Sequence, residues 1–226
     1  MIKVLALASA LLASASMAVA STNLLVNGGF ENTSPGGVTA TTTPQTFGNW
    51  QVATTSGSTN FYIFNAPGLN EAQPADGTKL LSIGGFNTTK GVGLLWQDFA
   101  TTAGQTYQVS FFFGRTNNTS DEVNVSVDAT AFNLVSGETT DTLGQISSGN
   151  APATGTTGTL NQVGFQFTAT GTSSRLLFAD TTVAGGPSLQ LDAVSVSAIP
   201  EPSSFAALAG IGALGLAGLR RRRSAR

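Results

Sequence analysis

The amino-acid sequence predicts an all-β fold, specifically an antiparallel β-sandwich of jelly-roll type. Short segments rich in Val, Phe, Leu and Tyr alternate with stretches of Gly, Thr, Asn and Pro. In three segments an apolar residue recurs at every second position, which places those residues on one face of a strand. Each such face needs a second layer, and two sheets packed face to face provide it. An immunoglobulin-like sandwich with fewer strands is the alternative.

Ten segments are the expected strands, and turn-forming residues separate them. They are Leu24–Phe30, Phe47–Val52, Asn60–Phe64, Leu80–Gly84, Val92–Phe99, Thr106–Phe113, Glu122–Phe132, Leu160–Thr168, Ser174–Ala179 and Leu189–Ser197. The three alternating rows are Tyr107, Val109, Phe111 and Phe113; Val123, Val125 and Val127; and Val163, Phe165 and Phe167. No stretch between the strands shows sustained helical periodicity with caps.

Residues 136–158 interrupt the strand pattern. The stretch consists mostly of small and polar residues, so it is too polar to bury much surface and predicts a long polar loop. A linker between two domains is rejected, because the roughly 40 residues beyond it are too few for a second core. We therefore expect one β-sandwich ectodomain over residues 21–199.

Composition excludes several classes of function. The sequence contains no Cys and no His, which excludes a disulfide framework, a thiolate zinc site, a histidine metal site and a Ser-His-Asp triad. The formal net charge of the chain is −2, but residues 21–199 carry four basic and eleven acidic side chains, a net charge of −7. An acidic domain of this kind is not expected to bind nucleic acid.

The N-terminus has the pattern of a secretory signal peptide over residues 1–20. Lys3 precedes an apolar run of Leu, Ala and Ser, and small residues at Ala18 and Ala20 come before Ser21. This arrangement predicts cleavage by signal peptidase after Ala20.

The C-terminus carries three elements in order. Pro200, Glu201 and Pro202 come first, residues 205–219 contain no charge, and a basic cluster follows at Arg220, Arg221, Arg222 and Arg223. A 15-residue helix rises about 22 Å, short of the roughly 30 Å hydrocarbon core. Ser203, Ser204 and snorkelling arginines extend the expected transmembrane helix to about residues 203–219, and the arginines favour the cytoplasmic side. A buried core helix is the alternative for this length.

This C-terminal region, residues 200–226, resembles the PEP-CTERM sorting signal of Gram-negative bacteria. The resemblance implies recognition by an exosortase-type membrane enzyme, with transient anchoring in the inner membrane followed by export. It also implies a destination at the cell surface or in an extracellular polysaccharide or biofilm matrix. The three elements are then a substrate site for the sorting enzyme and not a catalytic site.

Four motifs of the strand region resemble galactose-binding-like jelly rolls, which occur in carbohydrate-binding modules. They are Asn23 to Glu31, Pro74 to Gly84, Gln97 to Tyr107 and Leu191 to Val196. The resemblance implies a non-catalytic sandwich that binds polysaccharide. It also implies a structural calcium held by acids at the matching positions Glu31 and Asp192. This sequence departs from the common tandem Asp, because Ala193 follows Asp192.

Aromatic residues are the candidates for stacking on sugar rings, whose CH-rich faces suit flat side chains. Trp50 and Tyr62 lie among Asn, Gln, Ser and Thr, so either a surface or a core position fits them. Phe61 and Phe64 are further candidates, although Phe is normally a core residue. We expect Trp96, which shares a strand face with Leu94, to point into the core.

Catalysis has little support in the sequence. Asp121 and Glu122 are adjacent, so in a strand their side chains point to opposite faces, and no nucleophile elbow, phosphate-binding loop or dinucleotide fingerprint occurs. The expected function is therefore an exported, non-catalytic polysaccharide-binding protein. The alternatives are a structural matrix protein without a defined ligand and, with less support, a glycan hydrolase.

Overall fold

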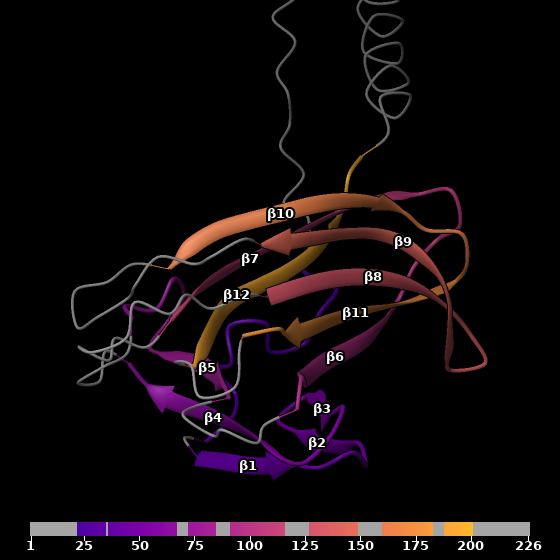
Figure 1. Cartoon of the computed structure of the whole chain (residues 1–226). Coiled ribbons are helices and arrows are strands. Elements are labelled where there is room, and N and C mark those ends of the chain that lie inside the picture. Colours follow the sequence, from indigo (N-terminus) through magenta and orange to yellow (C-terminus); the bar gives the residue numbers. More distant parts are fainter. Residues whose placement is uncertain are drawn as a thin grey trace, which may run out of the picture. The chain divides into compact units, whose positions relative to one another are not determined.

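The computed structural model describes residues 22–34, 36–66, 72–84, 91–115, 127–148, 160–182 and 188–200. These residues form twelve β-strands in two antiparallel sheets that pack face to face (Figure 1), and none of them lies in a helix. Residues Thr22–Ile199 make up one compact unit, and every residue of the main core comes from inside it. Such a unit is able to fold on its own.

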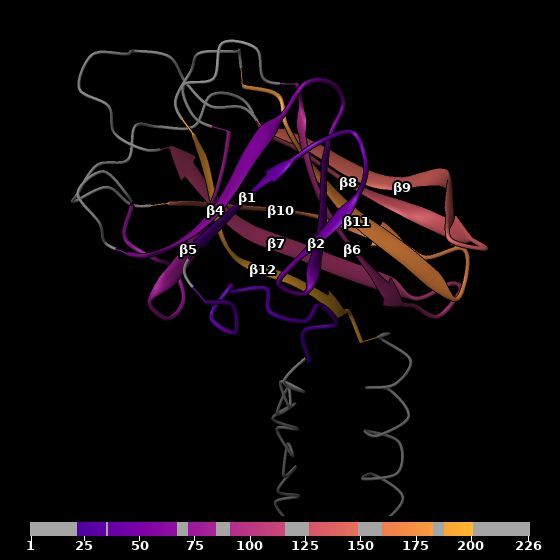
Figure 2. The ribbon, with the colours of Figure 1, turned by 90° about the horizontal axis from the view of Figure 1, so that it is seen from below.

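Each sheet has six strands. Sheet A runs in the order β1 (Gly36–Ala40), β4 (Thr59–Asn65), β5 (Lys79–Ile83), β12 (Leu189–Ala198), β7 (Thr106–Arg115) and β10 (Asn161–Thr168). Sheet B runs in the order β2 (Gln45–Phe47), β3 (Trp50–Thr54), β6 (Gly93–Ala100), β11 (Ser173–Asp180), β8 (Val127–Val135) and β9 (Glu138–Ser148). Figure 2 shows the two sheets from below, with the β8–β9 hairpin of sheet B on the right. The prediction of an all-β jelly-roll sandwich is confirmed.

Alternating side chains of both sheets form the core. The rows predicted in β7 and β10 do share one face, and that face points inward. They meet inward residues of sheet B such as Leu95, Leu176 and Phe178, all fully buried. Of the third predicted row, Val127 lies in the core, while Val123 and Val125 lie outside the described residues.

The prediction of a strand at Leu24–Phe30 is wrong. The segment is a series of turns and bends, in which Asn27 and Phe30 both have φ near 58°. The Asn27 side-chain oxygen accepts a bond from Asn32 N, 2.9 Å away, and this local bond stabilises the turn. Leu25 and Phe30 are nevertheless part of the core. The apolar residues of this segment therefore indicated correctly that it is buried, but not that its backbone is extended.

The prediction of a long loop over residues 136–158 is wrong for its first half. Ser136 and Gly137 form the turn of a hairpin, and residues 138–148 are strand β9, paired with β8. The ladder carries an extra residue on β9 at Leu143, because Gly144 and Thr142 face the consecutive residues Ala131 and Phe132. The bulge lets Leu143 and Ile146, three residues apart, both pack on the core, which hides the strand from a period-2 search. Residues 149–158 lie outside the described residues.

Three smaller differences concern strand bounds. The expected strand Phe47–Val52 is two strands, β2 and β3, joined by a turn at Gly48 and Asn49. Strand β1 was not predicted. The described part of the expected strand Glu122–Phe132 begins at Val127 and continues to Val135 as β8.

Candidate functional site

Tyr62 stands on the outer face of sheet A. Strand β4 alternates, with Phe61 and Ile63 buried in the core and Tyr62 and Phe64 on the opposite face. The Tyr62 and Phe64 rings stack with centroids 4.7 Å apart. Tyr62 remains 45% exposed and is the only aromatic side chain of the described residues with a largely exposed surface.

The edge strand β1 supports the Tyr62 ring. Gly37 pairs with Tyr62, and a β-carbon at residue 37 would collide with the ring, so only glycine lets the ring lie across β1. Beside it, the Thr39 hydroxyl donates to the Asn60 side-chain oxygen at 2.8 Å. We call these five residues, Gly37, Thr39, Asn60, Tyr62 and Phe64, the Tyr62 platform. It combines a flat ring with neighbouring polar groups, as sugar recognition requires.

The same sheet face has polar groups further along. A shallow hollow of about 300 Å³ lies between β7 and β10 and is lined by Gln108, Ser110, Gln162, Val163 and Gly164. Its amides and hydroxyls both donate and accept hydrogen bonds. The face thus has an aromatic ring near one edge and a polar hollow near the other.

Trp50 is a core residue, so the expectation that it could stack on a sugar is wrong. Its side chain is 1% exposed, with ring centroids 5.9 Å from Phe30 and 6.3 Å from Phe178. The indole Nε1 donates to the Asn27 carbonyl oxygen at 3.1 Å. The ring is therefore enclosed and its polar atom is satisfied inside the protein.

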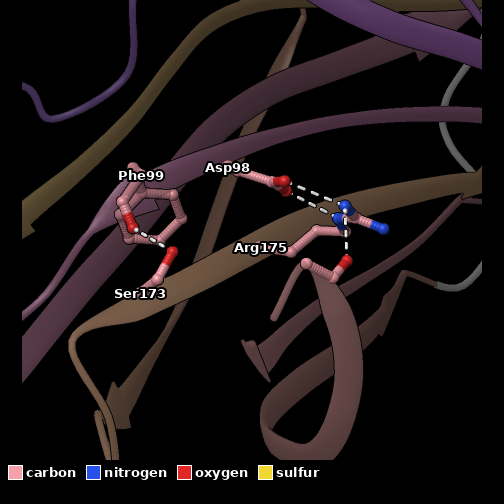
Figure 3. Close-up of polar contacts among 5 residues, drawn as sticks. Asp98, Phe99, Ser173 and Arg175 are labelled. Carbon is pink, nitrogen blue, oxygen red and sulfur yellow. Dashed lines mark hydrogen bonds and ion pairs between the residues drawn. The ribbon is translucent and has the colours of Figure 1, made fainter. Parts of the chain in front are cut away.

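Trp96 does not point into the core as expected. It alternates with the core residues Leu95 and Phe99 and lies on the outer face of sheet B, where the Arg175 guanidinium lies 5.4 Å from its ring centroid. Arg175 also forms a bidentate ion pair with Asp98 on the neighbouring strand, in which Nε donates to Oδ1 at 2.6 Å and Nη2 donates to Oδ2 at 2.9 Å (Figure 3). The hydrogen bonds to Asp98 raise the pKa of Arg175. Trp96 is left 8% exposed, so Arg175 closes this ring to a ligand.

Glu31 holds the segment before strand β5. Its Oε1 accepts bonds from Thr78 N at 2.7 Å and Lys79 N at 2.6 Å, and Oε2 accepts from the Thr78 hydroxyl at 3.1 Å. The Lys79 ammonium donates in return to the main-chain oxygen of Glu31. Burial alone would raise the pKa of Glu31, but these hydrogen bonds and the Lys79 charge outweigh it, so the pKa is lowered.

Asp192 holds the same segment from the other end. Its Oδ2 accepts from Ala75 N at 2.7 Å and Asp76 N at 3.0 Å, and its Oδ1 accepts from Ala193 N at 2.6 Å. Asp192 is 0% exposed. Burial raises its pKa to about 6, although the three N–H donors oppose this effect. Glu31 and Asp192 together form what we call the carboxylate clamp on residues 75–79.

The carboxylate clamp does not fit calcium. Calcium takes six to eight oxygen ligands, whereas the Glu31 and Asp192 oxygens already accept N–H and O–H donors, and the cation beside Glu31 is the Lys79 ammonium. Among the described residues no group of three acidic side chains is placed to hold a metal. The clamp joins Asn23–Glu31, Pro74–Gly84 and β12 through protein groups alone, which explains why these three motifs occur together.

We predict that calcium does not stabilise the unit. The melting temperature of residues 22–199 should be the same in excess calcium and in excess chelator, because the clamp oxygens are already bonded. Lys79→Met should lower the melting temperature equally in both conditions, since it removes the ammonium beside Glu31. A melting temperature that rises with calcium in the wild type and fails to rise in Glu31→Ala would contradict this.

The predicted processing sites lie almost entirely outside the described residues. They are Ala18, Ala20 and Ser21 at the N-terminus, and Glu201, Pro202, Arg220, Arg221, Arg222 and Arg223 at the C-terminus; Pro200 is the last described residue. The described part of the chain contains no helix long and apolar enough to cross a membrane. The expected helix at residues 203–219 falls outside that part.

Sequence reasoning found Tyr62 but missed most of its surroundings. The two-residue spacing of Tyr62 and Phe64 indicates a shared strand face, and that signal was available. Gly37 and the Arg175–Asp98 pair depend on which strands are neighbours, and one sequence does not contain that information.

Comparison with known families identifies the C-terminal motif. Residues 198–223 match the PEP-CTERM protein-sorting motif, so the chain carries this motif. A motif of this kind implies export and exosortase-dependent sorting. No curated protein matches the sequence.

Solved structures share the fold at low sequence identity. The enzymatically active domain of tailspike protein 4 from bacteriophage CBA120 is 15% identical over 78% of this chain, with a TM-score of 0.52. The arabinose-bound α-L-arabinofuranosidase MgGH51 is 17% identical over 78%, with a TM-score of 0.50. The matches cover only 21% and 26% of those two chains. The carbohydrate-binding module TmCBM61, solved with β-1,4-galactotriose, matches over its full length and 79% of this chain, at 17% identity and a TM-score of 0.48.

Proposed function

We propose that this protein is an exported, non-catalytic module that binds polysaccharide at the surface or in the extracellular matrix of a Gram-negative bacterium. After removal of the signal peptide it is anchored transiently in the inner membrane and then processed by an exosortase. The observation that carries the binding proposal is Tyr62, an exposed ring stacked on Phe64 and flanked by the polar side chains of Thr39 and Asn60.

The physical argument concerns the two kinds of surface that a pyranose presents. Its CH-rich face stacks on an aromatic ring, and its hydroxyls need partners that both donate and accept. The Tyr62 platform offers the ring together with Thr39 and Asn60. Recognition at such a site needs no titrating group, which agrees with the absence of His and Cys from the sequence.

Three acids of the described residues are engaged in structural bonds, which favours a non-catalytic role for them. Glu31 and Asp192 are held by main-chain N–H groups, and Asp98 is held by Arg175. Glycoside hydrolysis needs two carboxyl groups facing one substrate, and the Tyr62 platform contains none.

Binding should be lost when the ring is removed. We expect Tyr62→Ala to weaken the binding of residues 22–199 to polysaccharide at least tenfold, measured by affinity electrophoresis on a panel of neutral and acidic polysaccharides. The size of the effect is taken from the stacking of nucleic-acid bases on aromatic side chains, which contributes about 1–3 kcal/mol. Tyr62→Phe keeps the ring and should retain most of the binding. Val135→Ala, an exposed apolar residue of sheet B, is the matched control and should bind as the wild type does.

Two outcomes would reject the proposal: no retention on any polysaccharide, or unchanged retention of Tyr62→Ala. Tryptophan fluorescence is a poor reporter for this titration, because Trp50 and Trp96 are both buried. A structural matrix protein without a defined ligand is the alternative function.

A further inference from the structure

The outer face of sheet A carries a row of uncharged polar side chains on the two strands farthest from Tyr62. The even-numbered residues of β7 and β10 point outward, because the odd-numbered residues between them, such as Val109 and Phe167, lie in the core. The outward polar side chains are those of Thr106, Gln108 and Ser110 on β7 and of Gln162, Gln166 and Thr168 on β10. We call these six side chains the polar strip.

Two hollows lie along the polar strip. One is the hollow of about 300 Å³ at Gly164, a position without a side chain. The other has a volume of about 480 Å³, and Thr106, Gln166 and Thr168 are among the residues that line it. Both volumes fall in the range of small-molecule sites, about 300–1,000 Å³. Residues 162–168 of a strand extend over about 20 Å, so the two hollows together suit a chain better than a single small molecule.

Strand β9 forms a wall of the larger hollow. It lies along the outer edge of β10 (Figure 1), so close that a β-carbon at Gly144 would be 2.9 Å from the main-chain oxygen of Gln166. The bulge at Leu143 adjoins this contact, and Thr142 and Leu143 line the hollow from the β9 side. The edge of β10 is therefore covered, and a ligand reaches the polar strip from the outer face of sheet A.

Hydrogen bonds hold the side chains of the polar strip in place. Gln108 Nε2 donates to the main-chain oxygen of Phe165 at 3.2 Å, and Gln166 Nε2 donates to Gln108 Oε1 at 3.1 Å. The hydroxyl groups of Thr106 and Thr168 bond to each other at 3.1 Å. Each amide and hydroxyl has capacity for further bonds, as donor and as acceptor. Because these side chains are already fixed, a ligand binds them with a smaller loss of conformational entropy.

The absence of charge from the polar strip indicates the class of ligand. The basic side chains of the described residues lie elsewhere: Lys79 donates to Glu31, Arg115 is 7% exposed, and Arg175 belongs to sheet B. An acidic polymer needs cations on the surface that it meets, whereas residues 21–199 have a net charge of −7. A neutral chain rich in hydroxyl groups needs partners that both donate and accept, and amides and hydroxyls do so.

A small apolar cluster separates the polar strip from the Tyr62 platform. Ala72, Leu80 and Leu160 form the cluster, and Phe64 and Phe112 pack against it. Phe64 belongs to the Tyr62 platform, and Phe112 is the outward residue of β7 at which the polar strip ends. Strands β4 and β10 are four strand spacings apart in sheet A, a distance of about 20 Å. The two features are therefore separate sites.

We propose that the polar strip is a second glycan site, which binds a neutral polysaccharide chain lying along β7 and β10. This inference rests on the proposed function for the class of ligand, but it does not depend on Tyr62. With the Tyr62 platform near the other edge of sheet A, one sandwich would hold two polysaccharide chains, or two distant segments of one chain. Attachment at two sites increases retention on a polymer and links polymer chains to each other.

Nuclear magnetic resonance of the main-chain amides tests this site residue by residue. The probes are short neutral oligosaccharides of glucose, galactose, mannose and xylose, with an oligogalacturonate as the acidic comparison. In residues 22–199 at least one neutral probe should shift the amide signals of Gly164, Gln166 and Thr168, and the acidic probe should not. Gln162→Ala/Gln166→Ala should weaken this binding roughly tenfold, because it removes two hydrogen-bonding side chains. Both side chains are exposed, so the fold should be kept, which circular dichroism would verify.

Gln51→Ala/Gln145→Ala is the matched control, because it makes the same change on two strands of sheet B and should bind as the wild type does. Tyr62→Ala should leave the signals of the polar strip unchanged, so a failure of the Tyr62 platform is read separately from a failure of the strip. The proposal is overturned if no neutral probe shifts the strip signals, or if the acidic probe binds there equally well. Unchanged binding by Gln162→Ala/Gln166→Ala would also overturn it.

Discussion

Replacing Trp50 with alanine is expected to lower the free energy of unfolding of residues 22–199 by about 4 kcal/mol, within the range for deleting a buried aromatic side chain. Trp50 is 1% exposed and is in ring contact with Phe30 and Phe178. The substitution leaves a cavity between the N-terminal segment and sheet B. It also removes the donor to the Asn27 carbonyl oxygen. Urea unfolding followed by far-ultraviolet circular dichroism measures the change.

Trp50→Phe separates the two contributions. Phenylalanine keeps much of the buried apolar volume but loses the indole N–H, so its cost should be clearly smaller than that of alanine. Tyr62→Ala is the matched control on the same molecule, because its ring is 45% exposed, and it should change stability little. A loss below about 1 kcal/mol in Trp50→Ala would contradict the core position, since exposed substitutions give values of that size.

Asp192→Asn should become more stable relative to the wild type as the pH rises from about 4 to about 7. Burial raises the folded-state pKa of Asp192 to about 6, above the ordinary value of 3.8. Between these values the folded protein holds a proton that the unfolded chain has lost, so rising pH costs the wild type stability. Asparagine cannot ionise and escapes this cost. The difference in free energy of unfolding should shift by up to about 3 kcal/mol across the window.

Glu31→Gln, at the other carboxylate that binds residues 75–79, should show the opposite pH dependence of stability. The pKa of Glu31 is lowered in the folded protein from 4.5, so its stabilising effect is present above the unfolded value and is lost as the pH falls. The free energy of unfolding of the wild type should therefore increase relative to that of Glu31→Gln as the pH rises. Urea unfolding at a series of pH values measures both variants. If the free energy of unfolding of the wild type also increases relative to that of Asp192→Asn with rising pH, the prediction is contradicted. The three N–H donors would then lower the pKa of Asp192 by more than burial raises it.

The sheet faces were predictable where strands are regular. In β7 and β10 the apolar residues alternate without interruption, and the buried face follows from the two-residue period. The same reasoning places Tyr62 and Phe64 on one face of β4. The prediction fails at β9, where a bulge at Leu143 breaks the period, and at Leu24–Phe30, where Asn27 and Phe30 adopt positive φ.

The local sequence pattern does not predict whether a single aromatic residue lies in the core or on the surface. Trp50 and Tyr62 have similar polar neighbours in sequence, yet one is enclosed by Phe30 and Phe178 while the other lies across Gly37. Trp96 is buried by Arg175 from a strand nearly 80 residues away, with the ion pair to Asp98 spanning 77 positions. The main-chain N–H groups that bond to Glu31 and Asp192, on which our prediction about calcium rests, are likewise not visible in one sequence.

The two ends of the sandwich unit are tied to each other. Leu24 N donates to Val196 O at 2.8 Å, Val194 N donates to Gly28 O at 2.9 Å, and Asn23 bonds to the main chain of both Val194 and Val196. The segment runs antiparallel to β12, so Thr22 and Ile199 leave it at the same end. Mechanical tension between those two residues would open these bonds one after another, as a zipper opens. The same tension also loads the bonds that hold Ile199 to the start of β7, from Ile199 N to Thr106 O at 2.9 Å and from the Gln105 side-chain amide to Ile199 O at 2.6 Å.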